Sequence, residues 1–310
     1  MTFFMVAPLA LSVLLALTGA WLGRLLPPAT AVRLLSTTAL ISALTTGFVL
    51  TMAAFVAAAQ LEPVAAIGHW SARALAAGEP VPRPVGLICG AFVATLMGLA
   101  VWRVLRTGQD LFAAAAACRR LGNGTAGLVI LEDDTPDAYA IPALPGRVVV
   151  STSMLRALSA PERRVLLAHE ESHLRHHHHL YVQITELAAA ANPLLRPIAR
   201  AVRAGVERWA DEDAAAATGD RTLAARTVAR ASLARRGARS AQHPAAALHM
   251  SDGPAIARTK ALLAPPPTPR PALAIAVAAL ILTGCAGAIA VGHDTEHLFE
   301  VALSAYSRSH

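Results

Sequence analysis

The chain has 310 residues, of which 55% are hydrophobic and only 15% are charged. Because soluble domains carry about a quarter charged residues, this composition excludes a disordered chain and argues against an ordinary soluble protein. The net charge of +7 is almost entirely due to arginine, since Lys260 is the only lysine. We therefore expect a membrane protein, or a chain that combines membrane and soluble parts.

Four segments without charged side chains are long enough to cross a membrane. They cover residues 2–23, 34–61, 84–102 and 271–292, and each reaches the roughly 18–20 residues that span a hydrocarbon core of about 30 Å. The first lacks a basic start and is too long for a signal peptide, so we expect it to be retained. These segments predict three membrane helices within residues 1–107, a fourth at 271–292, and a short extracytoplasmic tail, 293–310.

The distribution of basic residues predicts the orientation, because cytoplasmic loops carry an excess of Arg and Lys. With the N-terminus outside, three basic residues lie on the outer side: Arg73, Arg83 and Arg308. Nine lie on the inner side: Arg24, Arg33, Arg103, Arg106, Arg119, Arg120, Arg258, Lys260 and Arg270. We therefore expect a multipass protein of the cell membrane, with residues 108–270 forming a cytoplasmic domain.

This domain combines short β-type runs with helical segments. Residues 128–131 and 147–150 are rich in Val, Ile and Leu and predict strands, separated by a polar stretch that contains Pro and Gly. A capping box with proline, Ser159-Ala160-Pro161-Glu162, predicts a helix from about 160 into the 180s. A further helix is expected from Pro197 to Thr218-Gly219, followed by a basic helical stretch at 221–239. The fold is thus expected to be mainly α, with membrane helices and an α+β domain that contains a small β-sheet.

The helix predicted from about residue 160 carries the sequence His169-Glu170-Glu171-Ser172-His173. Two histidines four residues apart lie on one helix face, separated by about 40°, so both imidazoles can reach one ion. Zinc is a suitable ion for such nitrogens. Glu170 would then act as the general base on a water that zinc activates. The alternative is an ordinary helix with solvated His and Glu side chains.

A third ligand is best sought on the next helix, because a catalytic zinc site has three protein ligands and one open position. Glu207 and Asp211 are again four residues apart. Glu207 would bind the metal, and Asp211 would accept the N–H of a ligand histidine. The alternative for Glu207 is a charged surface position on an arginine-rich helix.

The pattern His169-Glu170-x-x-His173 followed by Glu207-x-x-Ala210-Asp211 resembles the integral-membrane zinc metallopeptidases. These comprise the CAAX prenyl protease and heat-shock membrane protease family and the related beta-lactam sensor-transducer peptidases. The resemblance covers about residues 125–265 and implies a zincin-like domain tied to membrane helices, with two His and one Glu as zinc ligands. Three helices before the domain and one after favour the sensor-transducer arrangement, although residues 293–310 are too few for an antibiotic-binding domain.

Two further segments take part in the resemblance. Residues 146–151 resemble the strand that leads into the active-site helix, which implies that this strand lies along the cleft and pairs with an extended substrate. Residues 258–263 resemble an arginine-containing helix that follows the zinc ligands in the family.

Two other clusters receive less specific interpretations. We expect His176–His179 to form a solvated or weakly metal-attracting helix end, because a third ligand two turns along one straight helix does not converge with the first two. The basic stretch, comprising Arg221, Arg226, Arg230, Arg235, Arg236 and Arg239, is expected to be a solvated face or to contact lipid headgroups. It lacks the aromatic pattern of a nucleic-acid interface, so no nucleic-acid partner is predicted.

The sequence therefore predicts a membrane-bound zinc metalloendopeptidase in contact with the lipid bilayer. Its substrate would be a polypeptide, either a membrane protein or a cytoplasmic regulator. The alternative is a membrane signalling or scaffold protein with a non-catalytic metal site, but that function would not need Glu170. A small-molecule transporter would instead have polar or Gly/Pro-broken membrane helices.

Overall fold

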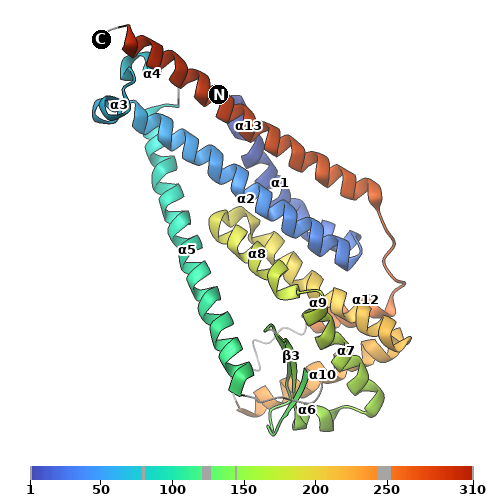
Figure 1. Ribbon diagram of the computed structural model, residues 1–310. Helices are drawn as coiled ribbons and strands as arrows, with labels where there is room; N and C mark the ends of the chain where they lie inside the picture. Colours follow the sequence, from blue (N-terminus) through green and yellow to red (C-terminus); the bar gives the residue numbers. More distant parts are fainter. Residues whose placement is uncertain (1, 79–80, 121–126, 144, 243–252, 309–310) are drawn as a thin grey trace.

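The computed structural model describes residues 2–78, 81–120, 127–143, 145–242 and 253–308 and is mainly helical. Long helices form one end of the molecule, and a small sheet surrounded by shorter helices forms the other (Figure 1). Within the described residues, four helices are long and apolar enough to cross a membrane, which suggests a membrane protein. They are α1 (Thr2–Leu25), α2 (Pro28–Ala59), α5 (Arg83–Arg120) and α13 (Pro271–Ser307). Two short helices, α3 (Glu62–Gly68) and α4 (Ala72–Ala77), connect α2 to α5.

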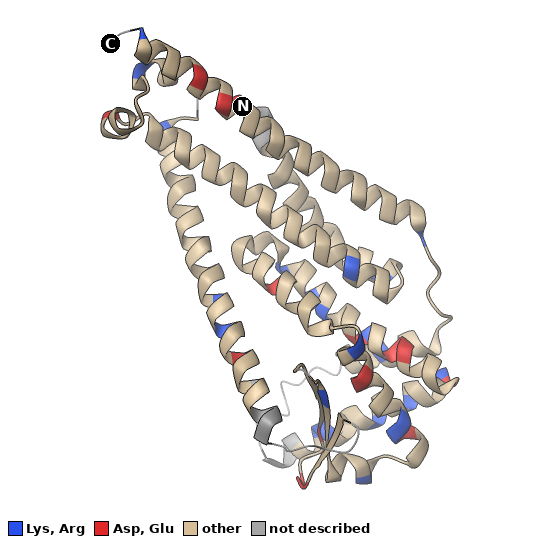
Figure 2. Cartoon of the chain, viewed as in Figure 1, with Lys and Arg blue, Asp and Glu red and all other residues tan. Residues whose placement is uncertain are grey.

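The long helices extend beyond the charge-free runs of the sequence. Helix α5 continues from the apolar run to Arg120, and α13 continues to Ser307 through much of the segment expected to be a tail. A helix does not have to end where it leaves the bilayer, because charged side chains are compatible with a solvated helix. The charged residues gather mainly around the sheet and the shorter helices (Figure 2). The limits of the membrane spans and the domain boundary near residue 107 stay predictions.

The sheet has three strands, β1 (Leu128–Leu131), β2 (Ala138–Ile141) and β3 (Arg147–Ser151), in the order β1-β3-β2. Strand β3 is parallel to β1 and antiparallel to β2. Strands β1 and β3 form at the predicted runs, whereas β2 lies in the stretch interpreted as a polar connection. Because β3 is paired on both sides, the expectation that this strand pairs with a substrate is wrong. Strand β2 is the edge strand next to it.

Among the described residues, the rest of the domain contains six helices and one short 3₁₀ segment between two of them. They are α6 (Thr152–Ala157), α7 (Ala160–Arg175), α8 (His178–Ala191), the 3₁₀ segment η2 (Pro193–Leu195), α9 (Arg196–Thr218), α10 (Arg221–Gln242) and α12 (Gly253–Leu263). Helix α7 starts where the capping box predicts it, and the Glu162 carboxylate accepts hydrogen bonds from the backbone N–H and the hydroxyl of Ser159, both at 2.8 Å. Helix α9 ends at Thr218 and is followed by Gly219, whose φ of 69° is left-handed, as expected for a helix terminator.

The predicted single helix from 160 into the 180s is wrong, because it breaks inside the histidine tract. Helix α7 ends at Arg175, and His177 has a left-handed φ of 51° before α8 begins. The break turns two histidines toward α9: His176 Nε2 lies 2.9 Å from Asp213, and His178 is fully buried. The expectation of a solvated helix end is therefore also wrong for His178, whereas His176 is only half-buried.

The hairpin formed by α8, η2 and α9 packs among the long apolar helices. Leu195 and Ile198 of the hairpin share one hydrophobic core with Leu15 and Leu35 of α1 and α2, and α8 lies beside α2 (Figure 1). At the tip, the Asn192 amide donates a hydrogen bond to Ser12 Oγ at 2.9 Å. Helix α9 thus contacts α1 and α2 as well as the sequence motif on α7.

Candidate metal centre

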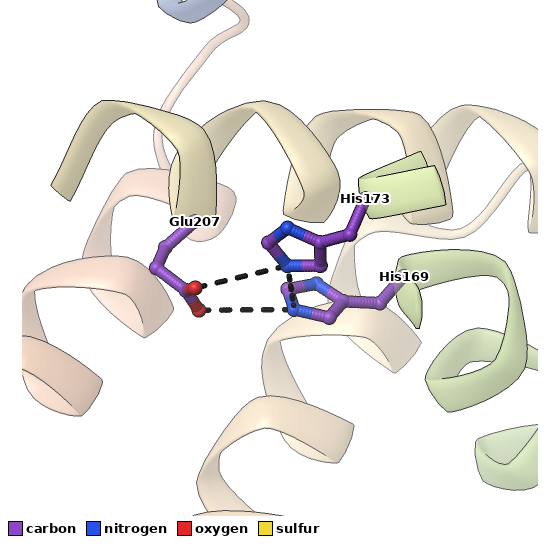
Figure 3. Close-up of side chains that lie close together, drawn as sticks. All are labelled: His169, His173 and Glu207. Carbon is purple, nitrogen blue, oxygen red and sulfur yellow. Dashed lines mark hydrogen bonds and ion pairs between the residues drawn. The ribbon is translucent and has the colours of Figure 1, made fainter. Parts of the chain in front are cut away.

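His169 and His173 on α7 meet Glu207 on α9 (Figure 3). The two Nε2 atoms lie 3.2 Å apart; that of His169 lies 3.7 Å from Oε2 of Glu207, and that of His173 lies 3.7 Å from Oε1. Ligand atoms bound to a tetrahedral zinc at about 2.0–2.2 Å are separated by roughly 3.3–3.6 Å. Two imidazole nitrogens and the Glu207 carboxylate, with one ligand atom from each residue within 4.8 Å of the others, could hold a single metal ion.

Asp211 contacts Nδ1 of His169, the ring nitrogen that is not among the candidate ligand atoms. Its Oδ1 atom lies 3.0 Å from His169 Nδ1, and its side chain is only 3% exposed. A carboxylate only accepts hydrogen bonds, so Nδ1 carries the proton and Nε2 presents its lone pair to the other ligand atoms. This contact is the one that the sequence analysis assigned to Asp211.

His178 contacts His173 in the same way, with 3.0 Å between their Nδ1 atoms. Burial lowers the pKa of His173 to about 4 and that of His178 to about 3, so both rings are neutral near neutral pH. If His173 bound a metal through Nε2, its Nδ1–H would donate to the lone pair of His178 Nδ1. This contact was not predicted from the sequence, because it depends on the helix break between α7 and α8.

Arg258 on α12 joins the two acidic residues of the centre. Its Nε and Nη2 atoms donate to the Asp211 carboxylate at 2.7 and 2.6 Å, and its Nη1 donates to Glu207 at 2.8 Å. Burial alone would raise the pKa of Asp211, but the hydrogen bonds from Arg258 and His169 lower it. Asp211 is therefore anionic when it accepts the His169 proton. The sequence analysis had assigned this arginine only to a helix of the resemblance.

Glu170 lies beside the centre in a cleft of about 500 Å³. Its side chain is buried, and this burial raises the pKa of its carboxyl group. The cleft is lined by the three candidate ligands, by α8 and by residues 137–140 in and before β2. The edge strand β2 and helix α7 thus face the same space.

The basic helix α10 contributes to the wall of this cleft. Arg235 donates to the carbonyl of Ala138 at 2.8 Å and pairs with Asp137 at 3.1 Å. Two other arginines of the stretch form ion pairs, Arg221 with Glu212 and Arg230 with Glu162. For Arg221 and Arg235, which are half-buried, the expected solvated or lipid-facing role is wrong, because the domain itself supplies their partners; Arg230 pairs with Glu162 but stays exposed, as expected.

The comparisons with known proteins add one finding to this geometry. The model of peptidase family M48 matches residues 104–266, slightly more than half of the chain, and this range includes all the residues of the candidate centre. No curated protein and no solved structure matched the chain.

Proposed function

The chain belongs to peptidase family M48 and is therefore a metallopeptidase that acts on polypeptides; we propose that it is a membrane-bound zinc endopeptidase. The observation that carries this proposal is that both histidines have a hydrogen-bond partner at Nδ1. Asp211 contacts Nδ1 of His169, and His178 contacts Nδ1 of His173. This arrangement would leave both Nε2 lone pairs free to bind a metal together with the Glu207 carboxylate.

Zinc is the metal that this donor set favours. Two imidazoles and one carboxylate are the three protein ligands of many catalytic zinc sites, which keep a fourth position open for the reaction. His169, His173 and Glu207 would hold the ion. When bound, zinc lowers the pKa of water and polarises a carbonyl group.

The remaining steps belong to side chains of the chain itself. Glu170 would take a proton from the attacking water and deliver it to the amide nitrogen that leaves. Its raised pKa suits both the acceptance and the return of a proton. Arg258 and Asp211 would keep Glu207 and His169 in place during this cycle.

The edge strand β2 would hold the substrate. An extended peptide can add to the unpaired edge of a sheet through main-chain hydrogen bonds, which bind it with little regard to sequence. β2 lines the cleft beside Glu170, so an added strand would bring its peptide bonds to the centre. Cleavage within a chain, rather than at an end, is consistent with a substrate held along its backbone.

We also propose that the protein spans the cell membrane four times, with the catalytic domain in the cytoplasm. The excess of arginine on the predicted inner side supports this orientation. The packing of α9 on α1 and α2 would hold the centre close to the inner face of the bilayer. Substrates would then be membrane proteins or cytoplasmic regulators that reach this face.

The test compares the full chain and its Glu170→Gln variant, both purified in detergent with Zn²⁺ and incubated with a proteome-derived peptide library. We expect internal cleavages by the wild type and at least about 100-fold fewer by the variant, with equal zinc content by elemental analysis. Equal cleavage by both would refute the role of Glu170. A wild type that binds zinc but cuts nothing would favour the signalling or scaffold alternative.

A further inference from the structure

A stack of side chains connects the long apolar helix α2 to the candidate ligand His173. The guanidinium carbon of Arg33 lies 4.7 Å from the centroid of the Trp209 ring. The ring centroids of Trp209 and His178 are 4.8 Å apart, and His178 in turn contacts His173 through the two Nδ1 atoms at 3.0 Å. Each neighbour in this series is in direct contact with the next.

The middle of the stack is buried. Trp209 is 5% exposed and His178 is 1% exposed. Nε2 of His178 has no hydrogen-bond partner among the described residues. The orientation of this ring therefore depends on its Nδ1 contact with His173 and on packing against neighbouring rings, of which Trp209 is the largest.

Trp209 contacts both the histidine tract and helix α2. It lies two residues after Glu207 on α9, and His176 and His178 pack against its ring. Arg33 approaches the ring from α2, within the distance of about 6 Å at which a cation is attracted to an aromatic face. The cation thus comes from a helix that the peptidase domain does not contain.

We propose that Arg33 and Trp209 are positioning residues for the metal centre, an inference that rests on the proposed zinc site. Arg33 holds Trp209 against His178, and His178 keeps His173 in the orientation that binds the metal. Helix α2 is therefore part of the support of the active site as well as a membrane anchor.

A different explanation for Arg33 is a positive charge that marks the inner edge of the membrane. Arg24 separates the two explanations, because it has the same charge, is also exposed and lies at the other side of the α1–α2 connection. A general charge effect would respond to Arg24→Gln and Arg33→Gln alike. A contact through Trp209 would respond only to Arg33→Gln.

The experiment measures the dissociation constant of Zn²⁺ alone, by competition with a chelator, for full chains in detergent. Removing a cation–π contact should weaken binding about two- to fivefold in Arg33→Gln. Changing the support of a ligand histidine should weaken it about 10- to 100-fold in Trp209→Leu and His178→Phe. Arg24→Gln should bind as the wild type does. The visible spectrum of bound Co²⁺ should change in the same three variants and stay constant in the control.

The double variant Arg33→Gln, Trp209→Leu decides whether the two residues act through one another. Its affinity should equal that of Trp209→Leu alone, because the guanidinium then has no ring to hold. Additive losses, or an Arg33→Gln chain that binds Zn²⁺ and Co²⁺ like the wild type, would overturn the inference. A wild type that binds no zinc would overturn the proposed function together with it.

Discussion

Arg258 holds the carboxylate of Asp211 with two nitrogens, at 2.6 and 2.7 Å. The same carboxylate accepts the Nδ1–H of His169 at 3.0 Å. Asp211 is 3% exposed, so its charge depends on these partners rather than on water. One arginine, nearly 50 residues away in the chain, thus neutralises the group that orients a candidate ligand.

Replacement of Arg258 by methionine should destabilise the centre strongly. Loss of one partner of a buried ion pair costs about 3–5 kcal/mol, because the other charge stays buried and unpaired. We expect a lower melting temperature in detergent and a zinc affinity that falls about 10- to 100-fold. Arg258→Lys should recover only part of both, since an ammonium group cannot form the paired contact. The exposed Arg226, replaced by Met, is the matched control; equal effects of the two Met variants would contradict this role.

Removing the metal should distinguish the role of the metal ligands from the role of the general base. An ion that binds only the folded state stabilises it by about 2.7 kcal/mol when its concentration is 100 times the dissociation constant. We expect chelation to abolish proteolysis and lower the melting temperature, and added Zn²⁺ to restore both. The thermal shift should persist in Glu170→Gln and disappear in Glu207→Ala. If Glu207→Ala kept the full shift, Glu207 would not be a ligand.

The parts of the fold that sequence could predict are those that local composition determines. Membrane-length helices need only a long apolar run, and α7 needs only its capping box. Strand β2 is different, because Ala138-Tyr139-Ala140-Ile141 has little strand character of its own and forms by pairing with β3. At the break after α7, likewise, His176 contacts Asp213 and His178 contacts Trp209, and both of these partners lie on another helix.

The candidate centre shows the same division. His169 with His173, and Glu207 with Asp211, could be predicted as pairs because a spacing of four residues places both members on one helix face. The structure brings the two pairs together, while their chemical roles stay predictions. Arg258 and His178 carry no comparable local pattern. Their importance is visible only when α12 and the start of α8 are placed against α7 and α9.

The orientation in the membrane can be tested by labelling single cysteines in chains whose native cysteines are replaced. Ser304→Cys lies on the exposed end of α13, and Asp134→Cys lies on an exposed loop beside the sheet. A membrane-impermeant maleimide should label the first in intact cells and the second only after permeabilisation. Equal labelling of both positions in intact cells would contradict four spans with a cytoplasmic domain.

The lowered pKa of Glu162 predicts how the stability of the peptidase domain depends on pH. Burial alone would raise its pKa, but hydrogen bonds from Ser159 and the ion pair with Arg230 lower it below the usual 4.5. A carboxyl group with a lowered pKa contributes its full stabilisation above pH 4.5, and this contribution disappears as the pH falls through the folded-state pKa. Glu162→Gln should therefore be less stable than the wild type at pH 7, by about 1–3 kcal/mol for a buried charged hydrogen-bond acceptor. The difference should shrink below pH 4.5 in denaturation curves recorded across this range. A constant difference at every pH would show that the cost comes from packing and not from the charge.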